Sequence, residues 1–159
     1  MEDYSIISKW DLWFHSINEN KWDKSSYKNL YPIENGLDYQ IICESFKQNH
    51  YQNGMFFIMK RGIFPNWEDP DNRSGGCLSF KISSEKVIDC WNYILLKCIE
   101  EKIMNNYNDK INGLSISPKK EFNIIKIWFS EKNIDYTNNF IKYSELNIDN
   151  SLYKEHSIK

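Results

Sequence analysis

The sequence predicts an α+β domain with a mainly antiparallel sheet and helices packed on one face of that sheet. Short segments in which apolar and polar residues alternate recur along the chain, as expected of strands with one buried face. Between them lie one medium and one long segment with apolar residues at helical spacing. Strands that are joined by hairpins and interleaved with amphipathic helices are typical of this fold class.

Length and composition restrict the kind of protein. A chain of 159 residues predicts a single domain, residues 1–159, with a sizeable core. Its net charge of −2 argues against generic binding along a nucleic-acid backbone. Its four cysteines form no CxxC pair, which predicts reduced thiols. Because the sequence shows neither a signal peptide nor a long apolar run, we expect a cytoplasmic protein with no membrane partner.

The first half of the chain predicts one strand, one loop and one helix. Residues 8–15 predict a strand with Trp10, Leu12 and Phe14 on its apolar face. A polar loop over residues 18–30 isolates Trp22 among Asn, Lys, Asp and Ser. Residues 36–50 predict a helix with Asp38 in the first turn, where a negative charge suits the helix dipole.

The second half predicts most of the sheet and the longest helix. Strands are expected over residues 55–60, 77–82, 114–117, 123–129 and 151–158. The longest helix is expected to start at Ser83 or Ser84 and to bury Trp91 in its apolar stripe. A short helix is predicted over residues 135–146. Alternation in the strand 123–129 places Ile124, Lys126 and Trp128 on one face.

The loop GIFPNWEDPDNRSGG, residues 62–76, is the most unusual stretch. Its two prolines and three glycines exclude a helix or a central strand. An indole such as Trp67 stacks on any base, and more strongly on a cationic one, while a carboxylate such as Glu68 can accept both hydrogen bonds from the guanine edge. On residue chemistry alone, a Trp that packs as a local lid beside a solvated Glu is the simpler interpretation, and both readings stay open.

A third reading is a nucleotide hydrolase that binds a metal ion through Glu68 and Asp69. Two neighbouring carboxylates without further acidic residues at helical or hairpin spacing make a poor metal site. We therefore do not expect a metal-dependent hydrolase, and we expect no metal or other cofactor.

The segment PNWEDPDNRSGG, Pro65 to Gly76, resembles the signature of the eukaryotic translation initiation factor 4E family, which binds the 7-methylguanosine cap of mRNA. The family's Trp-x-Leu-Trp-Phe opening is matched by residues 10–14, and the resemblance extends to about Trp128. It implies a strongly curved sheet with helices on the convex face and a cap-binding slot on the concave face. It also implies a role in translation initiation, with 5′-capped mRNA, or 7-methyl-GTP, as the ligand.

The resemblance further implies the residues of the site. Trp22 and Trp67 would sandwich the methylated base, whose edge would be read by Glu68. Trp128 would contact the N7-methyl group. The candidates for contacts with the cap phosphates are Arg73, Lys119 and Lys126.

The sequence departs from the family pattern at two places. The family commonly has Arg-Trp after the Gly-Gly pair, whereas this chain has Cys77-Leu78, so one expected phosphate contact is missing. No Trp stands near Gln40, where the family binds the scaffold factor 4G or a 4E-binding protein. This absence argues against the standard partner contact and leaves an alternative open, a competitor that sequesters caps or partners without recruiting ribosomes. The richness in Asn, Ile and Lys is typical of an AT-rich genome, as in some protists and large DNA viruses.

Overall fold

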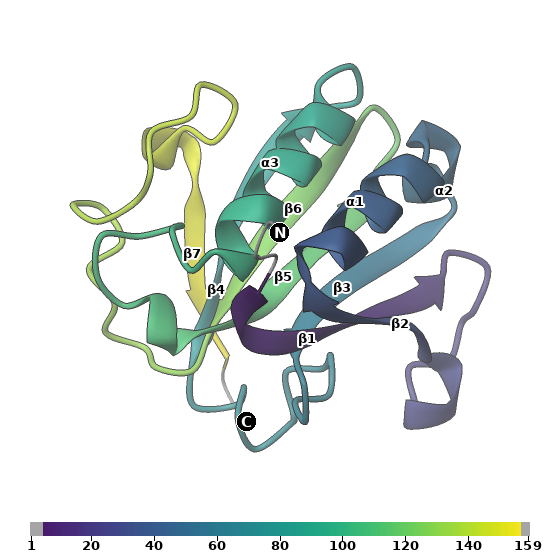
Figure 1. Cartoon of the computed structure of the whole chain (residues 1–159), viewed down its shortest axis with the longest axis horizontal. Helices are drawn as coiled ribbons and strands as arrows, with labels where there is room; N and C mark the ends of the chain where they lie inside the picture. The colour runs from purple at the N-terminus through teal and green to yellow at the C-terminus, as the bar shows by residue number, and fades with distance from the viewer. Residues whose placement is uncertain (1–4, 157–159) are drawn as a thin grey trace.

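The computed structural model describes residues 5–156 and is built on one seven-stranded sheet. The strands are β1 (Ser5–Ser16), β2 (Lys28–Asn35), β3 (Gly54–Lys60), β4 (Gly76–Ser83), β5 (Ile111–Pro118), β6 (Phe122–Phe129) and β7 (Leu152–Glu155). Their order is β2-β1-β3-β5-β6-β4-β7, and every neighbouring pair is antiparallel. The helices α1 (Gly36–Ser45), α2 (Gln48–Gln52) and α3 (Val87–Ile99) cover one side of this curved sheet (Figure 1). The predicted fold class is confirmed.

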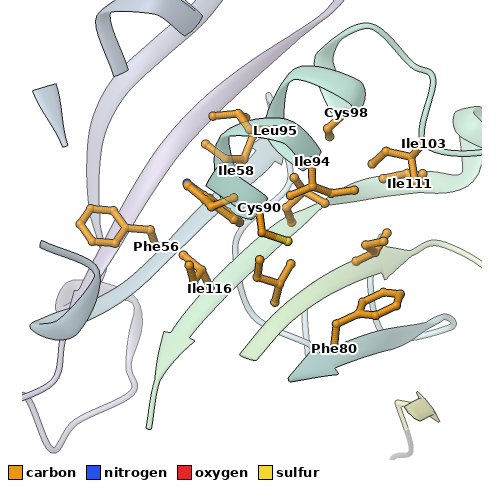
Figure 2. Packing of buried hydrophobic residues seen from close by; sticks show 14 of the residues in the cluster. Phe56, Ile58, Phe80, Cys90, Ile94, Leu95, Cys98, Ile103, Ile111 and Ile116 are labelled. Atoms are coloured by element: carbon orange, nitrogen blue, oxygen red, sulfur yellow. The ribbon is translucent and has the colours of Figure 1, made fainter. Parts of the chain in front are cut away.

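The main core lies between the helices and the convex face of the sheet. Figure 2 shows side chains of α3, Cys90, Ile94, Leu95 and Cys98 among them, packed toward apolar residues of the strands. Trp91 is 1 % exposed, so its predicted place in the core is confirmed. The helix begins at Val87 and not at the predicted serines, which precede it in a turn closed by a hydrogen bond from the backbone N–H of Lys86 to the carbonyl of Ser83 (3.0 Å).

Alternation along the strands divides their side chains between the two faces, as predicted. In β6, Ile125, Ile127 and Phe129 belong to the main core. Their neighbours Ile124, Lys126 and Trp128 lie on the concave face, away from the helices. The same division holds in β1, where Trp10, Leu12 and Phe14 pack with the core and Trp13 packs on the concave side. The concave face therefore carries its own side chains for a site.

The helix predicted over residues 36–50 is wrong in its extent. It is two helices, because Phe46 has an extended backbone (φ −106°, ψ 130°) that ends α1 before α2 begins. The start of α1 is fixed by a capping box in which Asn35 and Asp38 each accept from the other's backbone N–H. None of the helices in residues 5–156 is long and apolar enough to cross a membrane.

Two further segments differ from the sequence prediction. Lys28 to Leu30, for which the sequence predicts a loop, belong to the edge strand β2. Ile33 is the one buried residue of this strand, and Pro32 has no backbone N–H to donate to a neighbouring strand. The helix predicted over residues 135–146 is wrong, since turns replace it and Asp135 accepts from the backbone and side chain of Asn138. The last strand is confirmed over residues 152–155, while positions 157 and 158 of that prediction lie outside the described residues.

The path from β3 to β4 positions the unusual loop. β4 does not pair with β3 but lies beyond β5 and β6 in the sheet, where it pairs with β6 and β7. Residues 61–75 must therefore cross the ends of β5 and β6, near Asn112 and Trp128. This crossing brings the loop over one end of the concave face.

Candidate functional site

The concave face holds a groove of about 560 Å³ over β6, β4 and β7. Its lining residues are Trp67, Cys77, Ser79, Ile124, Lys126, Trp128, Leu152, Lys154, Glu155 and His156. Beside it, Phe57, Met59, Cys77 and Trp128 form a small buried cluster against which Trp13, Tyr27, Met55 and Ile63 pack. The groove thus combines an aromatic floor with basic side chains.

Trp128 is held rigidly at the floor of the groove. It is 7 % exposed, and its indole N–H donates to the hydroxyl of Ser115 on β5 at 3.0 Å. Its ring meets that of Phe57 edge to face, with centroids 6.3 Å apart. Because both neighbours lie on paired strands, the indole cannot rotate without losing this bond. The position of Trp128 on β6 and its hydrogen bond to Ser115 on β5 together fix the floor of the groove.

The carboxylate of Asp69 shapes the loop that carries Trp67. One of its oxygens accepts from the backbone N–H of Phe64 (3.0 Å) and the other from that of Asp71 (2.9 Å). Its own backbone N–H donates to the side chain of Asn66 (2.9 Å). Such Asx-type bonds replace the backbone pairing that a loop lacks. Asp69 therefore has a structural role in shaping the loop.

Asn72 joins the loop to the sheet. The residue is fully buried, and its amide donates to the carbonyls of Phe64 (3.1 Å) and Asn66 (2.8 Å). Its side-chain oxygen accepts from Asn112 on β5 (2.9 Å), which also donates to the carbonyl of Asp71 (2.8 Å). The loop is fixed by these buried amides, and none of the bonds uses Trp67 or Glu68.

Trp67 and Glu68 face outward from this fixed loop. Trp67 is 38 % exposed and lines the groove, with the ring of His156 at 28° to its own and 6.4 Å away. Glu68 is exposed and lies near Tyr27: burial, together with the charge of Glu68, raises the pKa of that phenol to about 12. Among residues 5–156, Glu68 makes no hydrogen bond or ion pair.

Trp22 lies on the same face but over β1. It is 53 % exposed and stacks flat on the buried ring of His15, with centroids 3.6 Å apart and planes at 4°. The two nitrogens of His15 lie 3.0 Å from the carbonyl oxygen of Ser16 and 2.8 Å from that of Lys21. His15 thus supports one face of Trp22 and leaves the other to solvent.

A chain of aromatic rings links the two ends of the concave face. Trp22 contacts Tyr27 edge to face (6.1 Å between centroids), and Tyr27 meets Phe57 at 5.7 Å. Phe57 in turn contacts Trp128. The structure therefore brings Trp67 and Trp128 to one groove, and places Trp22 and Glu68 around Tyr27 beside it.

The three basic candidates lie at three different places. Lys126 lines the groove, two residues from Trp128 on the same face of β6. Arg73 is exposed in the loop, where its backbone N–H donates to the carbonyl of Asp69 (2.9 Å). Lys119 stands at the tip of the β5–β6 hairpin and lines a separate depression of about 430 Å³. Of the three, Lys126 alone lines the groove that holds Trp67 and Trp128.

Comparison with known proteins identifies the family. The model of the eukaryotic initiation factor 4E family matches residues 5–157. The chain belongs to this family. An initiation factor 4E homolog of Acanthamoeba polyphaga mimivirus is 34 % identical over 64 residues, 39 % of this chain and 24 % of that protein. The isoform 4E factor of Prunus domestica is 26 % identical over 132 residues, 79 % of this chain and 61 % of that protein. The chain thus spans less than two thirds of the length of these relatives.

Solved structures of 4E proteins share the fold. C. elegans eIF4E-3, in complex with the 4E-binding protein Mextli and a cap analog, superposes with a TM-score of 0.76 at 20 % identity, covering 86 % of this chain and 80 % of that one. Ascaris suum eIF4E-3 with m7G cap gives a TM-score of 0.74 at 18 % identity, covering 86 % and 79 %. At such identities, the likeness concerns the fold.

The predicted 4E site did not include two residues that line the groove, Lys154 and His156. The ring of His156 lies 5.5 Å from that of Trp128, and its Nε2 is 3.6 Å from the sulfur of Cys77. Burial, and then the charge of Lys126, lower its pKa, so the ring is neutral at pH 7. The only local sequence signal for these two residues is the alternation in residues 152–156, which predicts a strand. It does not predict the position of that strand beside β4, because β4 is far away in sequence.

No group of three His, Cys, Asp or Glu side chains is arranged to hold a metal ion in the part of this 4E chain that the structure describes, residues 5–156. Asp69, one of the two carboxylates considered for a metal, has both oxygens bonded to backbone N–H groups. Burial raises the pKa of the Cys77 thiol, which lines the groove, to about 12, so this thiol is protonated at pH 7.

Proposed function

We propose that this chain binds the 7-methylguanosine 5′ cap of mRNA on its concave face and acts in translation initiation. The observation that carries the proposal is an exposed Trp67 on a loop held by buried amides, facing the same groove as Trp128. Family membership and the cap-bound 4E structures support the choice of ligand. We further propose that residues 1–159 act as one cytoplasmic domain, as a binding protein and not as an enzyme.

The methylated base is recognised by its charge and by its edge. Methylation fixes a positive charge on the ring, so each indole that stacks on it, Trp67 and Trp22, gains about 0.5–2 kcal/mol of cation–π energy. Glu68 has no bonding partner among residues 5–156 and is free to accept hydrogen bonds from the N1 and N2 donors. Trp128 lines the groove beside Trp67, where it can contact the methyl group. Unmethylated guanine loses the charge term and binds less tightly.

The phosphate chain extends from the base toward basic residues. Lys126 is the first candidate, because it lines the same groove as the two indoles. Arg73 and Lys119 remain candidates for phosphates farther from the base, since both side chains are exposed. A lysine keeps the charge that a phosphate needs but lacks the bidentate geometry of an arginine, so we expect phosphate contacts to add less affinity here.

The experiment is a titration of tryptophan fluorescence with 7-methyl-GTP and with GTP. We expect strong quenching by the methylated nucleotide alone. We also expect Trp67→Ala and Glu68→Ala each to abolish measurable retention on immobilised cap while the far-UV spectrum stays unchanged. The matched control is Asp71→Ala, which removes an exposed carboxylate from the same loop and should bind normally. Retained binding by either variant, or equal quenching by both nucleotides, contradicts the proposal.

The competitor function is favoured by one observation on the opposite face. Gln40 is exposed on α1, near the exposed apolar side chains of Leu37 (46 %) and Ile41 (45 %), where the resemblance places a partner-binding Trp. In this alternative, the protein still binds caps but does not recruit ribosomes through a 4G-like scaffold. A pull-down with a 4G-type helical peptide separates the two, because robust binding supports an initiation role and its absence supports competition.

A further inference from the structure

The groove contains a second basic side chain that lies beside the position of the missing arginine. Lys154 on β7 is the register partner of Cys77 on β4, and both residues line the groove. Cys77 pairs on its other side with Trp128 of β6. Trp128, Cys77 and Lys154 therefore form one row across three strands. From strand spacings of 4.7–4.9 Å, Lys154 lies about 10 Å from Trp128 across the sheet.

Lys126 approaches the same part of the groove from the other side. It pairs with Ser79, two residues after Cys77 on β4, so the two lysines flank that strand diagonally. Neither ammonium group makes a salt bridge within residues 5–156. An anion resting over Cys77 and Ser79 is within reach of both flexible side chains. Both charges are thus available to a ligand.

The remaining lining residues leave the groove electropositive near these lysines. Burial raises the pKa of the Cys77 thiol to about 12, so the thiol is neutral. The lowered pKa of His156 makes that ring neutral at pH 7. Glu155 contributes one negative charge against the two lysines, which gives the lining a net charge of +1. The balance favours an anion and also predicts that Glu155 weakens its binding.

We propose that Lys154, together with Lys126, binds the phosphate chain of the cap and supplies from β7 the cation that β4 lacks at Cys77. The assignment rests on the proposed cap-binding function and adds to it a residue that determines affinity for the phosphates. The base is held by the indoles and Glu68, so removing Lys154 lowers the affinity for 7-methyl-GTP and leaves that for 7-methylguanosine unchanged.

The test is the ratio of the dissociation constants for 7-methylguanosine and 7-methyl-GTP, measured by tryptophan quenching. In Lys154→Ala we expect this ratio to fall about tenfold, the loss of one charge-assisted contact, with nucleoside binding intact. Lys132→Ala, which removes an exposed lysine outside the groove, is the matched control and should leave the ratio unchanged. Glu155→Gln should raise the ratio, because it removes the negative charge from the lining.

A rescue variant separates a direct role from a structural one. Cys77 is the register partner of Lys154, so Cys77→Arg in the Lys154→Ala background places a cation one strand away. This double variant should recover most of the lost preference for 7-methyl-GTP over 7-methylguanosine. An unchanged ratio in Lys154→Ala, with nucleoside binding intact, overturns the assignment alone. If the unmodified protein binds neither ligand, the proposed function fails and the assignment fails with it.

Discussion

Replacing Asn72 by alanine should both destabilise the protein and release the loop that presents Trp67. The side chain of Asn72 is fully buried and makes three hydrogen bonds, two as donor to loop carbonyls and one as acceptor from Asn112. Alanine leaves those three partner groups without their bond in a region closed to water. Asn112 keeps its second bond, to the carbonyl of Asp71, so the sheet end itself should survive.

The expected cost follows from these bonds. A buried hydrogen bond contributes about 1 kcal/mol net, so three bonds give a loss of about 3 kcal/mol in the free energy of unfolding. This is a large fraction of the 5–15 kcal/mol that typical domains have. Urea denaturation followed by far-UV circular dichroism measures the change as a lower midpoint at an unchanged slope. The affinity for 7-methyl-GTP should fall as well, because Trp67 loses its fixed position.

Two further variants test this reasoning about Asn72. Asn72→Asp retains the acceptor but cannot donate to the two carbonyls. It therefore loses two hydrogen bonds and should be destabilised by at least about 2 kcal/mol. Asp71→Ala, an exposed neighbour, should leave the midpoint within about 0.5 kcal/mol of the original stability. A midpoint for Asn72→Ala equal to that of the unmodified protein would refute the claim that these amides hold the loop.

Two more predictions concern the end of this loop and the groove. A Cβ on Gly75 would clash with the carbonyl oxygen of Phe129, so Gly75→Ala must displace the backbone and should cost at least about 1–3 kcal/mol of stability. Around Gly62, no atom of residues 5–156 lies within 4 Å of such a Cβ, but φ is +95°. Gly62→Ala should therefore cost only about 1–2 kcal/mol in the same denaturation assay. The lowered pKa of His156 means that the unfolded chain binds a proton more readily than the folded one below pH 6.5. Stability should therefore fall from pH 7.5 to pH 5.5, and urea midpoints should fall less in His156→Gln.

Local sequence patterns could predict the elements whose side chains alternate or repeat strongly. In β4, β6 and α3 the pattern marks a buried face, whereas β3 is a continuous apolar run that is buried on both faces of the sheet. Each of these elements lies within a few residues of its predicted position. β2 could not be found in this way, because the edge strand buries little more than Ile33 and has no apolar period. The break between α1 and α2 could not be predicted either, because the extended backbone of Phe46 is not indicated by the spacing of apolar residues in the sequence.

The candidate site shows the same limit on a larger scale. Trp67 and Trp128 could be proposed because a motif and a strand pattern mark them. Lys154 could not, because its value depends on pairing with Cys77, a residue 77 positions earlier in the chain. Sheet order is set by long-range contacts, so a missing side chain on one strand can be replaced by one from a strand that is distant in sequence. Residue-by-residue comparison with a family pattern misses such a replacement.

The loop over residues 62–76 carries two sets of side chains with separate roles. Asp69 and Asn72 are needed for its shape, whereas Trp67 and Glu68 form none of the hydrogen bonds that hold it. A protein that kept only the fold would need the first set and would gain little from an exposed indole beside a free carboxylate. The presence of both sets favours a ligand over a bare scaffold. Whether that ligand serves initiation or competition depends on α1, which lies on the opposite face of the sheet (Figure 1). Variants of the groove and variants of α1 therefore test independent properties.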